Sequence, residues 1–172
     1  MTGLLGASTP ILQSSIYNLQ SVTIRPATAA DVPAMMALER HAVTAAHWSE
    51  ADYQRVFAPA AERLALVLEE TEVEGFVVAR GMGTEWELEN IAVAGPARRR
   101  GLGTRLLAEL LDRARQAGAR NVFLEMRESN RAARSLYEKW AFVESGRRKS
   151  YYRDPDEDAV LYRFTFSATP GK

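Results

Sequence analysis

Residues 86–110 read WELENIAVAGPARRRGLGTRLLAEL and hold three structural signals in succession. Residues 86–93 have the composition and partial alternation of a strand, which Gly95 and Pro96 end. From Leu102 onward apolar residues recur at helical spacing with polar residues between them, and Gly118 suits the C-terminal cap of that helix. The stretch therefore predicts a strand, a glycine-containing loop and a helix.

The loop of residues 98–104 has the composition of an anion-binding turn. Free N–H groups at the start of a helix and the positive end of its dipole attract phosphate. Gly101 and Gly103 let the backbone approach a ligand closely, and three arginines before them add positive charge. Leu106 stands where a dinucleotide fingerprint has its third glycine, and a P-loop would need a lysine here. By itself, the loop fits a phosphate ligand and a solvated turn equally well.

The alternation typical of strands and the apolar spacing typical of helices continue on both sides of this stretch. Thr28 with Asp31 and Ser49 with Asp52 form capping boxes that open two further helices, and Ser129 or Asn130 opens a fourth. We expect an α/β (α+β) fold with about seven strands and about four helices, the strands lying near residues 22–26, 64–68, 74–80, 86–93, 122–126, 142–145 and 158–166.

Length and composition limit the classes of function. The chain has 172 residues, 22 Lys plus Arg and 22 Asp plus Glu, so we expect one domain and no direct binding of nucleic acid. With no cysteine and two histidines, no thiolate or histidine-rich metal site is expected. Residues 1–21 form an uncharged leader before a domain over 22–168, and no segment resembles a secretion signal or a membrane span. We therefore expect a cytoplasmic protein without a membrane partner.

Three motifs follow one another along the chain: Asn90-Ile91-Ala92-Val93, then Arg98-x-x-Gly101-x-Gly103, then Leu124-Glu125-Met126-Arg127-x-Ser129-Asn130-x-x-Ala133-x-x-Leu136-Tyr137. In order and spacing they resemble the core of the GNAT superfamily of acetyl-CoA-dependent N-acetyltransferases, over about residues 23–166. The likeness is strongest to the RimI branch, which acetylates the N-terminal alanine of a small-subunit ribosomal protein. The resemblance implies a mixed, mostly antiparallel sheet, acetyl-CoA as cosubstrate, and the N-terminal segment of a protein, such as that ribosomal protein, as acceptor.

The resemblance also implies a role for individual residues. Glu125 would accept a proton from the amine and Tyr137 would donate one to the departing thiolate, after direct attack of the amine without an acyl-enzyme. A backbone N–H of residues 91–93 would stabilise the oxyanion. The cofactor would be held by the backbone of Ile91, Ala92 and Val93, by the loop residues Arg98, Arg99, Arg100, Gly101, Leu102, Gly103 and Thr104, and by Asn130.

Each catalytic assignment has a structural alternative. Glu125 lies within an apolar run, where a lone carboxylate costs free energy, but it can also pair with Arg127 on the same strand face. Tyr137 lies on the apolar stripe of its helix, where an aromatic residue usually belongs to the core. Glu87 and Glu89 share one face of their strand and are alternative candidates for the base.

Two alternative functions remain open at this point. One is an acetyltransferase for a small-molecule amine or a lysine side chain, and the other is a non-catalytic acyl-CoA-binding module. Three positions also depart from the family pattern: Ala141 replaces a glycine, Ser150 an asparagine and His47 a proline. Ala141 predicts a relaxed or strained turn where glycine would adopt a left-handed conformation. The other two lie in segments that would line the peptide pocket, so peptide specificity is the least defined property.

Overall fold

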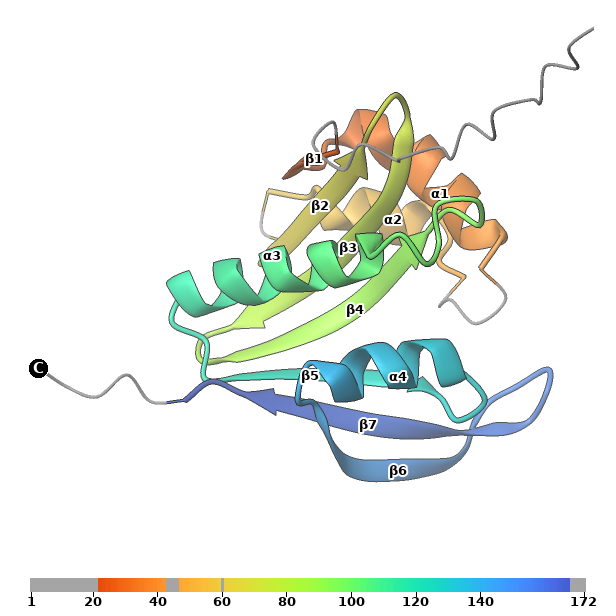
Figure 1. Ribbon diagram of the computed structural model, residues 1–172, viewed down its shortest axis with the longest axis vertical. Coiled ribbons are helices and arrows are strands. Elements are labelled where there is room, and N and C mark those ends of the chain that lie inside the picture. The colour runs from red at the N-terminus through yellow and green to blue at the C-terminus, as the bar shows by residue number, and fades with distance from the viewer. Residues whose placement is uncertain (1–21, 43–46, 60, 168–172) are drawn as a thin grey trace, which may run out of the picture.

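The computed structural model describes residues 22–42, 47–59 and 61–167, and in that part of the chain seven strands form one sheet with helices on both faces (Figure 1). The strands are β1 (Thr23–Pro26), β2 (Arg63–Glu69), β3 (Val73–Met82), β4 (Glu85–Val93), β5 (Asn121–Arg127), β6 (Val143–Tyr152) and β7 (Glu157–Thr165). The helices are α1 (Val32–Arg40), α2 (Glu50–Val56), α3 (Leu102–Gln116) and α4 (Arg131–Lys139), and a 3₁₀ turn, η2 (Ala29–Asp31), precedes α1.

The sheet is mixed and mostly antiparallel, as predicted. Its strand order is β1-β2-β3-β4-β5-β7-β6, and every neighbouring pair is antiparallel except β4 and β5. A parallel pair needs a crossover connection, and the glycine loop with α3 provides it. The strand, loop and helix predicted from residues 86–110 therefore join the two halves of the sheet.

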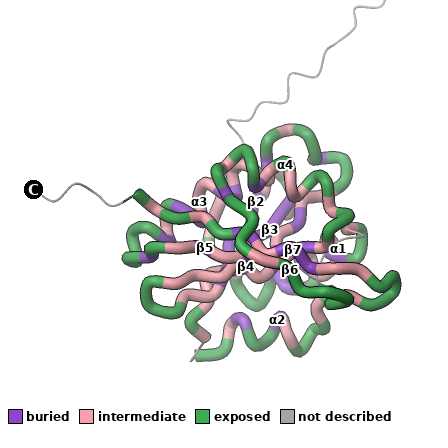
Figure 2. The backbone as a smooth tube through the Cα atoms, turned by 90° about the horizontal axis from the view of Figure 1, so that it is seen from below, coloured by how far each residue is buried: buried purple, intermediate pink, exposed green. Residues whose placement is uncertain are grey.

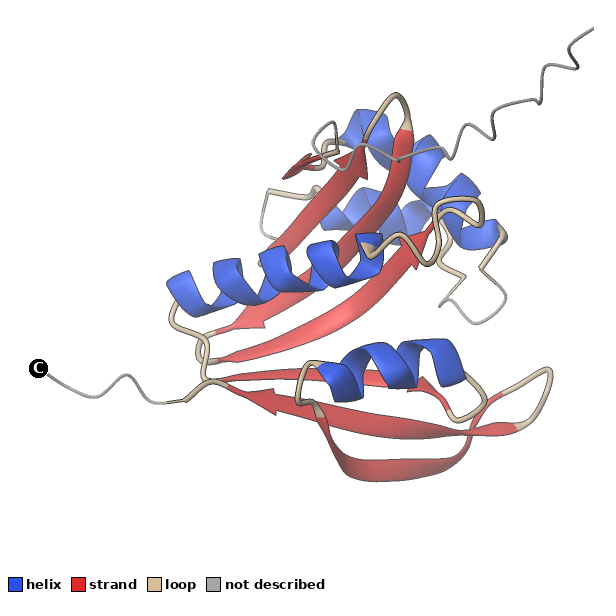
Figure 3. Cartoon of the chain, viewed as in Figure 1, coloured by secondary structure: helices blue, strands red, loops and turns tan. Residues whose placement is uncertain are grey.

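Helices lie against both faces of the sheet (Figures 1 and 3), and two apolar clusters hold them there. The larger cluster contains the buried leucines of α3 together with Tyr137 of α4, and the smaller one contains Met35 of α1 and Tyr53 of α2. Burial is concentrated in the central strands, whereas the edge strand β6 is largely exposed (Figure 2). Both helical layers thus rest on the same central strands.

β4 and β5 separate partway along their length, and this separation positions the site. Their parallel pairing extends from Glu85 with Asn121 to Leu88 with Leu124. On its other side, β4 pairs with β3 through a bulge, because Ala79 faces Leu88 whereas Val78 faces Asn90. Such a bulge bends a strand and changes which side chains face each layer.

The predicted elements are present with two differences in their limits. The helix expected to run from the Thr28 capping box to residue 41 begins with the η2 turn before α1. β6 is much longer than the predicted strand at residues 142–145. The prediction was too short because the exposed polar residues of β6 lack the apolar alternation that identifies a strand. The predicted leader lies outside the described residues, and the boundary at 22–168 stays a prediction. None of the helices in the described ranges is long and apolar enough to cross a membrane.

Candidate active site

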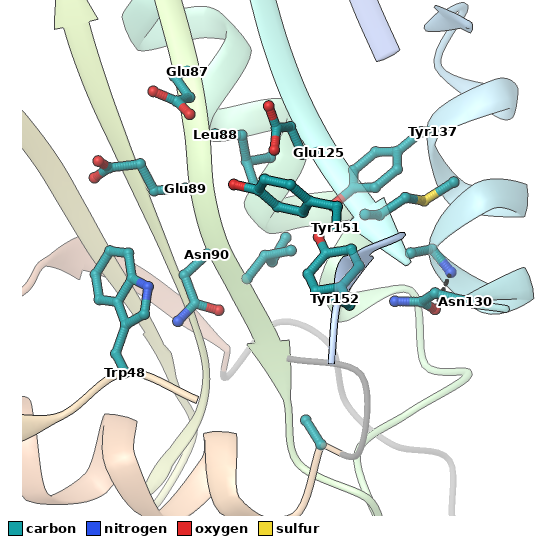
Figure 4. A pocket seen from close by; sticks show the side chains of 14 residues that line it. Trp48, Glu87, Leu88, Glu89, Asn90, Glu125, Asn130, Tyr137, Tyr151 and Tyr152 are labelled. Carbon is teal, nitrogen blue, oxygen red and sulfur yellow. Dashed lines mark hydrogen bonds between the residues drawn. The ribbon is translucent and has the colours of Figure 1, made fainter. Parts of the chain in front are cut away.

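Two cavities meet where β4 and β5 separate. The first has a volume of about 360 Å³ and is lined on one side by Tyr151 and Tyr152 of β6 (Figure 4). It is called the hairpin cavity, after the antiparallel pair of β6 and β7. The second, of about 800 Å³, is lined by the loop of residues 97–104 and is called the loop cavity. Both are lined by Ala42, Ile91, Asn130, Ala133 and Tyr137. A ligand in one cavity can therefore reach a ligand in the other beside Tyr137.

The wall that β4 contributes to the loop cavity is made of backbone. Ile91, Ala92 and Val93 pair with β3 on one side, and on the other side β5 has already separated from β4 within the described sheet. The side chain of Ala92 is buried in the smaller apolar cluster. The three residues thus present an open strand edge to the cavity, which suits an extended ligand that carries amide groups.

The loop itself meets the requirements of a phosphate cradle. Gly101 is the N-cap of α3 with φ of +77°, and a Cβ at this position would meet no atom within 4 Å. Gly103 and Thr104 follow in the first turn of the helix, whose leading N–H groups have no partner within the helix. Leu102 is buried in the core, so only its backbone is available to a ligand. These residues line the loop cavity, and their free backbone N–H groups and backbone shape fit a pyrophosphate.

The three arginines of the loop do not share one role. Arg98 and Arg99 line the loop cavity, and Arg98 also donates hydrogen bonds to the carbonyl groups of Val93 and His41 at 3.3 and 3.4 Å. Arg100 does not line this cavity, and its guanidinium forms an ion pair with Glu70 at 3.0 Å. The structure therefore groups Arg98 and Arg99 with the cradle and orients the Arg100 side chain toward the β2–β3 turn.

Glu125 projects from β5 into the hairpin cavity (Figure 4). Its side chain is 23% exposed, and its Oε1 lies 2.9 Å from Nη2 of Arg148 on β6. The alternative pairing with Arg127 is wrong, because Arg127 forms an ion pair with Glu157 at 3.4 Å. Glu125 is thus within reach of a ligand in the cavity, and its partner is an arginine side chain that is 53% exposed.

Tyr137 lies on α4 at the junction of the two cavities. Its side chain is only 3% exposed, yet it lines both of them. Burial raises the pKa of the Tyr137 hydroxyl above its usual value, so the hydroxyl keeps its proton at neutral pH. Asn130, the N-cap of the same helix, accepts a hydrogen bond from the N–H of Ala133 at 3.1 Å and also lines both cavities.

The alternative bases on β4 are already paired. Glu87 and Glu89 both line the hairpin cavity, opposite Glu125 (Figure 4). Glu87 accepts a hydrogen bond from Arg80 at 2.9 Å, and Glu89 accepts two from Arg63 at 2.7 and 2.9 Å. Glu89 is 12% exposed and both of its oxygens bond to Arg63 of β2, which makes it less accessible than Glu125, whereas Glu87 is 36% exposed and stays an alternative base.

Several residues of the hairpin cavity were not identified from the sequence. The segments of His47 and Ser150 were expected to line a peptide pocket, and their neighbours Trp48, Tyr151 and Tyr152 do line the cavity. The pKa of the Tyr152 hydroxyl is raised, mainly by burial and secondly by the nearby carboxylate of Glu125. Asn90 was quoted only as part of a motif, and no local signal marks a strand asparagine as a cavity residue.

An open strand edge beside a glycine loop, with Glu125 and Tyr137 lining one cavity, is an arrangement suited to an acyltransferase that uses coenzyme A. Residues 32–142 match the model of the acetyltransferase (GNAT) family, and the chain belongs to that family. It is therefore an acetyl-CoA-dependent N-acetyltransferase.

Two curated relatives match this chain over nearly their whole length. The chain is 34% identical to the ribosomal protein bS18 alanine N-acetyltransferase of Escherichia coli K12 over 150 residues, which cover 84% of this chain and 98% of that protein. The enzyme of the same name from Salmonella typhimurium is 35% identical over the same length.

Solved structures show the same fold. The ribosomal-protein-S18-alanine N-acetyltransferase of Escherichia coli superimposes with a TM-score of 0.77 and 31% identity, over 87% of this chain and 96% of that chain. NAA60 of Arabidopsis thaliana in complex with acetyl-CoA superimposes with a TM-score of 0.74 at 18% identity, over 84% of this chain and 98% of that chain, which shows a shared fold.

Proposed function

We propose that this enzyme acetylates the α-amino group of a protein N-terminus, and that its substrate is the N-terminal alanine of a small-subunit ribosomal protein. The Escherichia coli and Salmonella typhimurium enzymes named for this reaction match the chain over almost their full length, which supports the proposal. The observation that carries it is the junction of the two cavities at Tyr137, with Glu125 on the hairpin side and the phosphate cradle on the loop side. Such a substrate agrees with the cytoplasmic location expected from the sequence.

The chemistry of the site favours an α-amine over a lysine side chain. An α-amino group with a pKa near 8 is about one-tenth neutral at pH 7, whereas a lysine amine with a pKa near 10.4 is neutral in about one molecule in 2,500. The difference corresponds to about 3.3 kcal/mol. A carboxylate such as Glu125, partly exposed and not buried in the core, is a base suited to the easier deprotonation.

Two side chains handle the protons in the proposed reaction. Bound acetyl-CoA supplies a thioester carbonyl that a neutral amine can attack directly. Glu125 takes the proton that the attacking nitrogen loses, while the guanidinium of Arg148 moves aside. Tyr137, which keeps its proton at neutral pH, donates it to the leaving sulfur. A backbone N–H on the open edge of β4 at residues 91–93 stabilises the negative charge on the carbonyl oxygen.

The proposed substrate class is tested by measuring release of coenzyme A from acetyl-CoA with a panel of acceptors. The panel contains peptides that begin with Ala, Ser or Gly, the same peptides N-blocked but carrying a lysine, and several polyamines. We expect turnover only with free N-termini, and fastest with Ala. Turnover of blocked lysine peptides or of polyamines would keep the enzyme class and contradict the proposed substrate.

The proposed roles are tested by Glu125→Gln and Tyr137→Phe, each measured with the acceptor that turns over fastest. We expect each to lower kcat by at least about 100-fold, because each removes a proton acceptor or donor from the reacting atoms. Glu128→Gln and Tyr162→Phe are matched controls, because Glu128 pairs with Arg147 and the Tyr162 hydroxyl bonds to Glu138. If kcat were unchanged in either test variant, that residue would not have the proposed role.

A further inference from the structure

A buried carboxylate lies behind the wall of the hairpin cavity. Glu39 of α1 is 2% exposed and accepts hydrogen bonds from three residues. Its Oε2 accepts from the Tyr53 hydroxyl at 2.8 Å and from the backbone N–H of Trp48 at 3.1 Å, and its Oε1 accepts from Nδ2 of Asn90 at 2.8 Å. Trp48 and Asn90 line the cavity, but Glu39 does not. Glu39 can therefore act on a ligand only through them.

This network fixes the orientation of the Asn90 amide. A carboxylate only accepts hydrogen bonds, so the amide must present its NH₂ group to Glu39 and turn its oxygen the other way. The second contact of Asn90, from Nδ2 to the Tyr53 oxygen at 3.4 Å, has the same direction. Figure 4 shows the nitrogen of Asn90 on the side of Trp48 and its oxygen on the side of Tyr151 and Tyr152.

The Asn90 oxygen is the part of this network that a ligand can reach. Asn90 as a whole is only 4% exposed, yet it lines the hairpin cavity. Within the described part of the chain, no residue donates a hydrogen bond to Oδ1 of Asn90. This oxygen is also absent from the fully buried atoms that lack a partner there, so it is not sealed off in the core. A hydrogen-bond acceptor in a fixed orientation thus faces the cavity opposite Glu125.

We propose that Asn90 is a binding residue for the acceptor: its Oδ1 accepts a hydrogen bond from an N–H of the incoming amine or its first peptide bond, and Glu39 is the positioning residue that keeps this oxygen turned toward the cavity. The inference rests on the proposed function, because it names the contact that an amine-bearing chain makes in the hairpin cavity. It concerns the binding of the acceptor, whereas Glu125 and Tyr137 move protons.

Replacing one oxygen of Glu39 tests the inference without removing volume. In Glu39→Gln, the amide oxygen is held where Tyr53 and Trp48 donate, so its NH₂ group faces the NH₂ group of Asn90. A half-turn of the Asn90 amide relieves this opposition and directs its NH₂ group into the cavity. The cavity then presents a donor where it had an acceptor. We expect KM for the acceptor to rise about tenfold, with KM for acetyl-CoA unchanged.

A second substitution restores the acceptor atom. In the double variant Glu39→Gln with Asn90→Asp, one Asp oxygen accepts from the new Gln amide and the other faces the cavity. We expect KM for the acceptor to return to within about threefold of the wild-type value. Asn90→Asp alone places two carboxylates in contact, so it should lower the unfolding temperature. Glu109→Gln, which breaks only the exposed pair with Arg113 on α3, is the matched control and should leave both KM values unchanged.

The outcome separates this inference from a purely structural role of Glu39. A lower unfolding temperature of Glu39→Gln with an unchanged acceptor KM would overturn it. An equal rise in KM for acceptor and acetyl-CoA, or a double variant no better than Glu39→Gln, would also overturn it. If the acceptor panel identifies an amine other than a protein N-terminus, the proposed function fails. The inference is then tested with that amine, by comparing the change in its KM with the change in KM for acetyl-CoA. An acceptor analogue with an ester in place of the first peptide bond shows which N–H is bound. If Glu39→Gln raises KM less for this analogue than for the peptide, the bound group is the peptide N–H.

Discussion

Ala141 follows the C-cap of α4, the helix that carries Tyr137, and its backbone lies in the left-handed region with φ of +61°. The N–H of Ala141 donates to the carbonyl of Glu138, and the N–H of Phe142 donates to the carbonyl of Tyr137, both at 3.0 Å. These two bonds form a Schellman motif, in which glycine is the usual residue at this position. Of the two outcomes expected from the sequence, the structure contains the strained one. His47 and Ser150, the other departures from the family pattern, also have positive φ, at +53° and +47°.

Ala141→Gly should stabilise the protein. A left-handed conformation costs an L-residue about 1–2 kcal/mol, and the greater freedom of glycine in the unfolded chain offsets part of the gain. We expect a net gain of about 0.5–1 kcal/mol, seen as a rise of about 2 °C in the unfolding temperature by calorimetry. Ala108→Gly, within α3, is the matched control and should lower stability by about 1 kcal/mol. A loss of stability in both variants would mean that the turn at Ala141 carries no strain.

At the scale of elements, local sequence patterns predicted the helices and strands whose formation depends on residues close together in the chain. The capping boxes, the glycine loop and the apolar stripe of α3 are local patterns, so the helices and the strand–loop–helix unit could be predicted from them. The β4 bulge and the length of β6 depend on partners far away in the sequence, and they were not predicted. The same holds for the contact of Asn90 with Glu39, which joins residues 51 positions apart.

α3 offers a direct comparison of its two ends. Gly101 precedes it with φ of +77°, Gly118 follows it with φ of +86°, and a Cβ at either position would meet open space. Valine should therefore cause similar backbone strain at both ends and lower the unfolding temperature of both variants. Only Gly101 lines the loop cavity, so Gly101→Val should weaken acetyl-CoA binding at least about tenfold in a calorimetric titration, and Gly118→Val should not. Equal affinities in the two variants would exclude the loop as the phosphate cradle.

Across the whole molecule, the site lies at the join between two parts of one sheet. β1 to β4 form one part and β5, β7 and β6 the other, and four residue pairs connect them along β4 and β5. Beyond these pairs the strands separate, and the two cavities extend to either side of Tyr137. Packing of α3 and α4 in one apolar cluster keeps the two parts together. The fold can therefore hold an open strand edge at its centre without losing its core.

We expect the acid stability of the domain to depend on a cluster at the β1 edge of the sheet. Arg25 of β1 donates two hydrogen bonds to Asp31 at 2.9 Å and contacts Glu69 of β2 at 2.9 Å. The hydrogen bonds from Arg25 hold the pKa of the Asp31 carboxyl at about 2, below its ordinary value. Because the carboxylate is stabilised in the folded state, its contribution is complete above about pH 4 and is lost as the pH falls through about 2.

Asp31→Asn should therefore lower the free energy of unfolding by about 1–2 kcal/mol at pH 7, and the difference from wild type should shrink between about pH 4 and pH 2. Urea titrations at a series of pH values measure both quantities. Asp112→Asn, at an exposed position of α3, is the control and should run parallel to wild type over this range. A difference between Asp31→Asn and wild type that stayed constant down to pH 2 would mean that the ionised form of Asp31 is not what stabilises the folded state.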